Sequence, residues 1–198
     1  MLIQNISSFR FFLFLLYSLA LPVESREIPA LTGPVIDEAQ LLSQREKALL
    51  TQELRSYYQK SGHQIQLLII DSLKGDSLEE FSISVADKWK LGSKKEDNGV
   101  LFLISYKDRS MRIEVGRGLE GDLTDIASKR ILREAKTYFG KGRFYEGTSI
   151  AFKQIYATIS KDPNIINAKE KKNIPLIKGL LTLLTFTVFS LFVFFGVG

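Results

Sequence analysis

The sequence predicts an α/β domain in which helices cover the faces of a small mixed β-sheet. Apolar runs of strand length at residues 64–70 and 100–105 alternate along the chain with segments of helical periodicity. Residues 111–116 instead alternate apolar and polar side chains, as an antiparallel strand with one covered face does. A length of 198 residues suits one such domain with additional segments at its ends.

The first expected helix begins near Ser43, because Ser43-Gln-Arg-Glu46 forms a capping box. Gly62 suits the position that follows a helix. Between them, apolar side chains recur at helical spacing, at Leu50, Leu54, Tyr57 and Tyr58. Residues 64–70 then show the nearly continuous apolar pattern of a buried parallel strand, QIQLLII.

A second helix is expected between the capping box that starts at Ser77 and the break at Gly92. Its buried stripe consists of Phe81, Val85 and Trp89. Residues 100–116 follow as a hairpin, and its second strand turns three side chains inward, Met111, Ile113 and Val115, and two outward, Arg112 and Glu114.

Two helices complete the domain. Thr124 is the expected cap of a third helix, which ends at Gly140 and Gly142, and a fourth helix covers residues 144–159. This order of helices and strands gives a small mixed sheet with helices on its faces.

Both ends of the chain differ in composition from this domain. Residues 11–21, FFLFLLYSLAL, form a short apolar segment behind Arg10 and are typical of a signal peptide, here assigned to residues 1–25. Small residues place its cleavage after Ala20 or, as we favour, near Ser25, and an uncleaved anchor is the alternative. The domain then covers residues 26–160, a polar juxtamembrane linker residues 161–175, and a transmembrane helix residues 176–198. Its uncharged run of 20 residues, 179–198, is long enough to cross a bilayer.

The two ends give opposite indications of topology. A signal peptide exports the domain that follows it, so the C-terminal helix tethers that domain outside the cytoplasmic membrane. Lysines on the domain side of the helix, at 169, 171, 172 and 178, favour the cytoplasm instead. We expect the signal peptide to dominate, because a leader dictates export whereas a charge bias only tilts the choice.

Composition excludes several classes of function. The chain has no Cys, which excludes disulfides, thiolate metal sites and a Cys nucleophile, and one His, which excludes a multi-His metal site. The net charge is +5, but residues 29–160 carry 20 Lys and Arg against 18 Asp and Glu. No clustered basic face is evident, so we expect no nucleic acid partner.

Acidic and Gly-rich loops flank the predicted hairpin. The first loop ends in Asp97-Asn98-Gly99, and the second runs from Gly116 to Asp125. Because the start of one antiparallel strand lies beside the end of its partner, we expect the two loops to meet at one edge of the sheet. Their carboxylate and amide oxygens suit Ca²⁺ or Mg²⁺, and the candidate metal ligands are Asp97, Asn98, Glu120, Asp122 and Asp125.

These residues also have an ordinary structural interpretation. Asp-Asn-Gly is a common turn sequence, and an Asp near a helix N-terminus stabilises the helix dipole. Arg117 is a candidate anion-binding residue or a partner of Glu120. Asp37 caps or braces the first helix, and His63 fits a surface turn. No catalytic nucleophile or base is identified, and no serine-hydrolase motif occurs.

The blocks Val35-Ile-Asp-Glu-Ala39, Asp97-Asn98-Gly99-Val100-Leu101 and Ile113-Glu114-Val115-Gly116-Arg117-Gly118-Leu119-Glu120-Gly121 resemble the TPM domain family. The resemblance covers about residues 33–160 and includes Leu41-Leu42-Ser43. It implies a three-layer α/β/α sandwich. Asp97 and Glu120 match the family pattern, Asp122 and Asp125 occupy the acidic stretch that follows, and Asp37 lies in the first block.

The resemblance implies two classes of function. A plant thylakoid member is described as an acid phosphatase involved in photosystem II repair, some bacterial members bind Ca²⁺, and a nematode member is an auxiliary protein of an acetylcholine receptor. The first hypothesis is a membrane-tethered module that binds a divalent cation and acts in the assembly or maintenance of membrane proteins. The alternative is a metal-assisted phosphomonoesterase, in which Asp97, Asp122 and Asp125 hold the cation and Arg117 contacts phosphate.

Overall fold

A computed structural model describes residues 26–160 of the chain. Four strands, four α-helices and one 3₁₀ turn follow in the order β1 (Val35–Asp37), α2 (Gln44–Ser61), β2 (Gln64–Ile70), α3 (Leu78–Trp89), β3 (Gly99–Ser105), β4 (Ser110–Val115), η1 (Arg117–Leu119), α4 (Asp125–Phe139) and α5 (Phe144–Ile159). The predicted α/β class with a small mixed sheet is therefore confirmed.

The strands form one sheet in the order β1-β2-β3-β4. β1, β2 and β3 are parallel, and β4 is antiparallel to β3, with Val100 opposite Val115. We call the end where β2 and β3 begin and β4 ends the amino edge. The opposite end, where β1, β2 and β3 finish, is the carboxyl edge.

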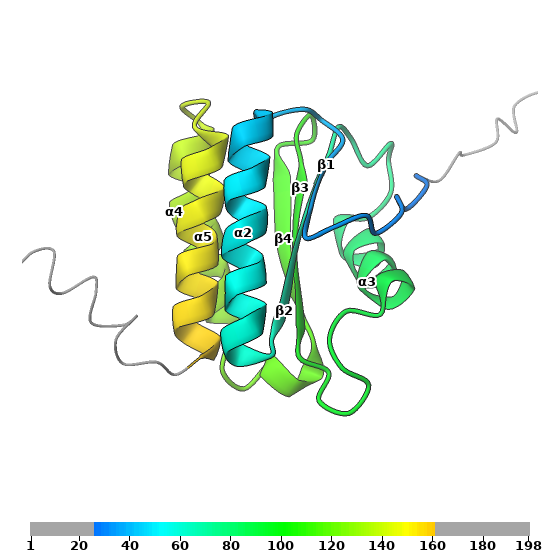
Figure 1. Cartoon of the computed structure of the whole chain (residues 1–198). Coiled ribbons are helices and arrows are strands. Elements are labelled where there is room, and N and C mark those ends of the chain that lie inside the picture. The colour runs from blue at the N-terminus through cyan, green and yellow to red at the C-terminus, as the bar shows by residue number, and fades with distance from the viewer. Residues whose placement is uncertain (1–25, 161–198) are drawn as a thin grey trace, which may run out of the picture.

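Helices cover both faces of this sheet, so that the layers run helices, sheet, helix (Figure 1). Alternate residues of β2 and β3 point to opposite faces, because the side-chain period of a strand is two. Leu67 and Phe102 pack with α2, α4 and α5, whereas Leu68 and Leu103 pack with α3. Both central strands are buried throughout, which explains their continuous apolar sequences.

The two crossover connections have opposite handedness. Both α2 and α3 connect neighbouring parallel strands, and both connections advance in the same direction across the sheet. The two helices nevertheless lie on opposite faces. One crossover therefore departs from the right-handed rule that nearly all such units obey.

The predicted helix caps are confirmed by geometry. Ser43 and Glu46 form the reciprocal capping box of α2, and the side chains of Ser77 and Thr124 accept hydrogen bonds at the starts of α3 and α4. Of the apolar side chains at helical spacing in α2, Leu50 and Leu54 are buried, whereas Tyr58 is 56% exposed. Strand β1 was not predicted, because three residues are too few for a periodic pattern.

Helix α5 runs from the carboxyl edge to the amino edge. Near its start, the ring of Phe144 lies 5.7 Å from that of Tyr106, which follows β3. Near its end, Tyr156 stacks on Tyr57 of α2 with ring centroids 3.9 Å apart, close to where α2 leads into β2. The chain after Ser160 therefore leaves the domain at the amino edge.

Three expectations lie outside the described residues: the signal peptide at 1–25, the linker at 161–175 and the transmembrane helix at 176–198. Within residues 26–160, no helix has the length and hydrophobicity needed to span a bilayer.

Candidate functional site

An open groove of about 870 Å³ lies at the amino edge, on the face that α3 covers. One wall comes from the second half of α3 and the loop that leads into β3. The other wall comes from the end of β4 and from η1. The apolar residues Ile83, Leu91 and Leu101 contribute to its lining, and charged residues surround them.

The two acidic loops meet in this groove, as the hairpin predicts. The backbone N–H of Arg117 donates to the Asp97 carboxylate over 3.2 Å, and the Arg117 Nε lies 3.3 Å from the same oxygen. The N–H of Gly118 donates to the backbone carbonyl of Asp97 over 3.1 Å. The sequence therefore brings together residues twenty positions apart, by pairing the strands that the loops flank.

Glycine makes this approach of the two loops possible. A Cβ atom on Gly116 would lie 2.2 Å from the carbonyl oxygen of Asp97, and one on Gly118 would lie 1.7 Å from that of Glu96. Both distances are far shorter than any normal contact, so only glycine fits at these positions without moving the backbone. Asp97 itself has a positive φ of 46°, a conformation that Asp tolerates better than most residues.

Asn98 holds the first loop in shape. It is 4% exposed, and its Oδ1 accepts from the Ser93 N–H over 2.9 Å. Its Nδ2 donates to the carbonyl of Gly62 and to the carboxylate of Glu96, each over 3.1 Å. Its only side-chain oxygen is thus already bonded to the loop, so the predicted ligand Asn98 has a structural position.

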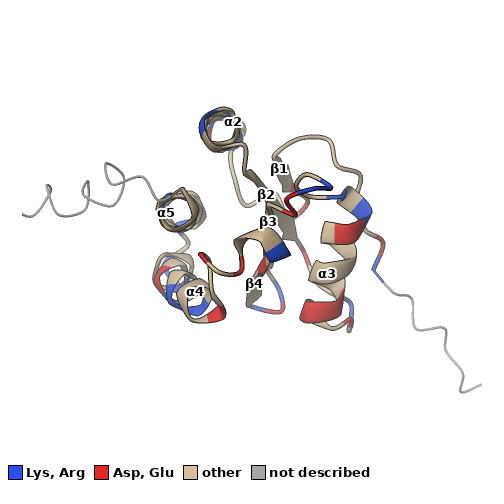
Figure 2. Cartoon of the chain, turned by 90° about the horizontal axis from the view of Figure 1, so that it is seen from below, with Lys and Arg blue, Asp and Glu red and all other residues tan. Residues whose placement is uncertain are grey.

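The groove carries charges of both signs. Its lining includes four cations, Lys90, Lys94, Lys95 and Arg117, and five carboxylates, Asp87, Glu96, Asp97, Glu114 and Glu120. Figure 2 looks onto this end of the domain and shows acidic and basic stretches near one another on α3 and around η1. The Arg117 side chain is 89% exposed and that of Asp97 47%, so their ion pair is open to solvent and weak.

The five predicted metal ligands do not form one coordination sphere. Asp97 and Glu120 line the groove, whereas Asp122 and Asp125 are not among its lining residues. Asp125 is the first residue of α4, where its charge complements the helix dipole. Among residues 26–160, no three His, Asp or Glu side chains are arranged to hold a metal ion. Glu96, which was not among the predicted ligands, also lines the groove.

Asp37 lies at the opposite end of the sheet from the groove. It ends β1, is 8% exposed, and accepts from the N–H groups of Leu41 and Leu42 over 3.3 and 2.9 Å. It therefore braces the turn before α2, one of its two expected roles. It is too far along the sheet to support the acidic loops, as the register of β1 with the end of β2 requires.

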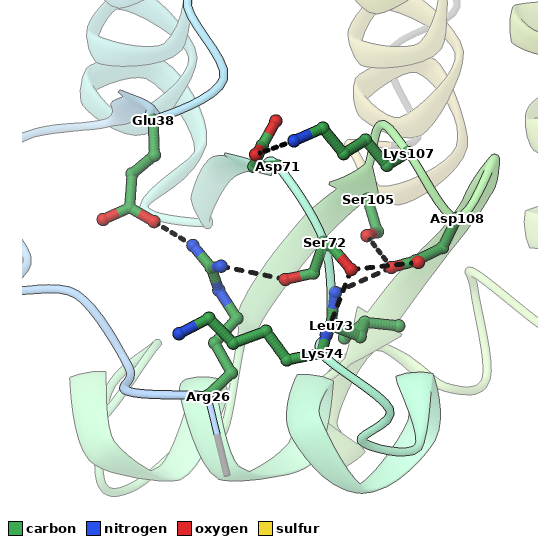
Figure 3. Close-up of polar contacts among 9 residues, drawn as sticks. All are labelled: Arg26, Glu38, Asp71, Ser72, Leu73, Lys74, Ser105, Lys107 and Asp108. Carbon is green, nitrogen blue, oxygen red and sulfur yellow. Dashed lines mark hydrogen bonds and ion pairs between the residues drawn. The ribbon is translucent and has the colours of Figure 1, made fainter. Parts of the chain in front are cut away.

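A polar network that the sequence did not predict fills the carboxyl edge (Figure 3). The Asp108 carboxylate accepts from the Ser105 hydroxyl, the Leu73 N–H and the Ser72 hydroxyl over 2.5, 2.6 and 3.1 Å. These hydrogen bonds, with that of Ser105 the largest effect, hold the pKa of Asp108 below its usual value. The only sequence signal was the turn sequence around Asp108, which by itself did not indicate its partners.

Another carboxylate with a shifted pKa lies away from both edges. Glu53 of α2 is half-buried against α5, and burial raises its pKa despite the hydrogen bond that the Tyr57 hydroxyl donates over 2.9 Å. Ser149 lies 3.5 Å from its other oxygen. Because Glu53 is not among the groove's lining residues, we assign this group to the packing of α2 on α5.

Comparison with known proteins supports the fold. A family model described as the TPM domain matches residues 35–158. The solved N-terminal domain of a protein from P. gingivalis is 26% identical, with a TM-score of 0.61 over 75% of this chain and 95% of that domain. The N-terminal domain of a Corynebacterium glutamicum protein has 11% identity and a TM-score of 0.53, over 71% of this chain and 88% of that domain. The BA42 protein of the psychrophilic bacterium Bizionia argentinensis has 16% identity and a TM-score of 0.56, over 63% of this chain and 86% of that protein. The last two are similar in fold alone, and no curated protein matches the chain.

Proposed function

Because the chain belongs to the TPM domain family, we propose that it is a membrane-tethered binding module whose amino-edge groove takes a charged segment of a neighbouring membrane protein. The observation that carries this proposal is the form of the groove. It is open along its length, about 870 Å³ in volume, and lined by charges of both signs around an apolar floor. Sites of chemistry are usually enclosed and expel water, whereas an open charged rim suits a polypeptide partner.

The direction of α5 supports a partner in or at the membrane. The described domain ends at the amino edge, and the predicted linker and transmembrane helix follow Ser160 in the sequence. The groove lies at this same end of the domain. α5 and the groove lie on opposite faces of the sheet, but a tether at this end of the domain still keeps the groove close to the membrane surface. That position raises the effective concentration of neighbouring membrane proteins. By its predicted leader, the domain lies on the extracytoplasmic side.

A divalent cation is the second part of the proposal. Asp97 and Glu120 line the groove and carry carboxylate oxygens of the kind that Ca²⁺ and Mg²⁺ prefer. Because the described residues form no metal site by themselves, water or the partner segment would supply the remaining ligands. Binding would replace the exposed Arg117 at the Asp97 carboxylate, so that the cation and Arg117 compete. The freed Arg117 then offers a cation to an acidic partner segment or to a phosphate group.

Site-directed photocrosslinking of the full chain in its own membrane tests the partner. A photoreactive residue at Lys94, on the groove, is expected to crosslink one defined membrane protein. The same residue at Gln52, exposed on α2, is the matched control and is expected to give no such product. Arg117→Glu should weaken the crosslink at Lys94. If Lys94 and Gln52 crosslink equally, or if Arg117→Glu leaves the crosslink at Lys94 unchanged, the groove is not the binding surface.

Calorimetry and hydrolysis assays on the purified full chain test the cation and the phosphomonoesterase alternative together. Ca²⁺ binding should be lost in Asp97→Asn and kept in Asp125→Asn, because only Asp97 lines the groove. If both variants lose Ca²⁺ binding equally, the cation does not bind in the groove. A metal-dependent rate of phosphate-ester hydrolysis that Asp97→Asn abolishes would replace the binding proposal with an enzymatic one.

A further inference from the structure

Arg26 is clasped by two loops at the carboxyl edge (Figure 3). Its Nη1 donates to the carbonyl of Ser72 over 2.8 Å, and its Nη2 pairs with the carboxylate of Glu38. These partners follow β2 and β1 respectively. The Arg26 side chain is only 12% exposed, which is unusual for an arginine and shows that its position is built into the fold.

The backbone nitrogen of the same residue has its own acidic partner. The Arg26 N–H donates to Oδ2 of Asp76 over 2.8 Å. Asp76 belongs to the loop between β2 and α3, and its own N–H donates to the carbonyl of Leu73 over 3.1 Å. A carboxylate fixed at a backbone nitrogen is also the arrangement that holds a free α-ammonium group, which offers three N–H donors and a full positive charge.

We propose that a signal-type peptidase cleaves the chain between Ser25 and Arg26, and that Asp76 then holds the new α-ammonium group of Arg26. Hydrolysis adds one water across the peptide bond. Ser25 leaves with the new carboxylate, and the Arg26 nitrogen takes up the protons that make it an ammonium. In the sequence, Val23 and Ser25 stand at the third and first positions before this bond, the places where such peptidases need small side chains.

Cleavage at this bond strengthens a contact that already exists. The hydrogen bond from the neutral amide to the Asp76 carboxylate becomes an ion pair in which donor and acceptor both carry a charge, which is stronger. The Arg26 side chain does not need to move, because its bonds to Ser72 and Glu38 do not involve the backbone nitrogen. Cleavage after Ala20, the other candidate bond, would leave an ordinary amide at Arg26 and give Asp76 no new charge to bind.

The first test is N-terminal sequencing of the full chain, produced with its leader in an exporting bacterium and purified from the membrane. Arg26 is the expected first residue. A mature chain that starts at any other residue, or an uncleaved chain, overturns the proposal.

The second test measures the contact itself on the same processed chain. Peptide mass spectrometry follows the acylation of the Arg26 α-amine, which should be about threefold to tenfold slower in the native chain than in urea. Asp76→Asn should remove most of this protection, whereas Asp71→Asn, which changes an exposed pair with Lys107, should keep it. The rate at Lys129, an exposed lysine on α4, reports whether a variant is folded. Equal α-amine rates in native and unfolded wild type overturn the proposal even if Asp76→Asn does not fold.

Discussion

The two edges of the sheet use their charges differently. At the carboxyl edge, Asp108 accepts three hydrogen bonds from the protein and Arg26 is nearly buried. At the amino edge, Asp97 has one exposed partner, Arg117, beside an open groove. Open α/β sheets usually bind ligands at the carboxyl ends of their strands. Here the chain's own polar groups occupy the carboxyl edge, and the charged groove lies at the amino edge.

The comparison shows how one small sheet separates stability from binding. Hydrogen bonds to a charged acceptor stabilise a fold most when several converge on it, as on Asp108. An exposed pair such as Asp97–Arg117 contributes little, so its partners remain available to a ligand. Substitutions at the two edges should therefore have effects of different kinds.

The largest effect is expected where the two loops touch at the amino edge. Gly118→Ala places a Cβ 1.7 Å from the Glu96 carbonyl oxygen, so the loops must separate. We expect a loss of about 3 kcal/mol in the free energy of unfolding. Gly121→Ala is the matched control, because nothing lies within 4 Å of its Cβ and its effect should stay within about 0.5 kcal/mol. Urea unfolding of the full chain, followed by fluorescence of the buried Trp89, measures both. Similar midpoints for the two variants would mean that the loops are not in contact.

A smaller but clear loss in the free energy of unfolding is expected for a substitution at the carboxyl edge. Asp108→Asn removes the charge that the Ser105, Leu73 and Ser72 donors share, and should cost about 1 kcal/mol, because Asp108 is exposed and water screens its charge. Asp71→Asn changes a neighbouring carboxylate whose pair with Lys107 is exposed, and should cost less than about 1 kcal/mol. If the same urea experiment gives equal losses, the network has no special role.

The pH dependence of stability tests whether the charge of Asp108 stabilises the fold. The pKa of Asp108 is lower in the folded chain than its usual value of about 3.9, so the ionised group favours the folded state. The stability difference between wild type and Asp108→Asn should be constant at neutral pH and decrease as the pH falls below about 4, through the folded pKa. A difference that is still constant at about pH 2 would exclude the carboxylate charge as its origin.

The smallest change in stability is expected for Asp97→Asn. Asn adopts the left-handed backbone conformation of this position readily, and the lost ion pair is exposed. Its free energy of unfolding should change by less than about 0.5 kcal/mol, while Ca²⁺ binding is lost. A large drop in the urea midpoint would show instead that Asp97 is structural, like Asp108.

The sequence predicted elements whose signals are local. Capping boxes and apolar periodicity placed four helices and three of the four strands, and strand pairing brought together the loops of Asp97 and Arg117. The protein partner expected for Arg117 was Glu120, whereas the structure pairs it with Asp97. Strand β1 was not predicted, because its three residues form a strand by pairing with β2 and show no periodic pattern of their own.

Contacts between residues far apart in the sequence were not predicted either. The wall of the groove that α3 provides, including Asp87 and Lys90, depends on how that helix crosses the sheet. The three donors to Asp108 come from the end of β3 and from the loop after β2, more than thirty residues apart, and no local pattern brings these two segments together. Asp122 and Asp125 were grouped with Asp97 because they belong to the loop that follows β4, but neither lines the groove, and Asp125 is already the first residue of α4.

The stack of Tyr156 on Tyr57 also has a mechanical consequence. It lies one turn before the chain leaves α5, with the two rings nearly parallel at 5°. A pull on the chain beyond Ser160 acts on the last turn of α5, which the buried Ile159 and the Tyr156 stack hold against the domain, and the stack passes part of the load into α2. Unwinding of the last turn of α5 then requires the rings of Tyr156 and Tyr57 to separate. The stack therefore stabilises this end of the helix against fraying.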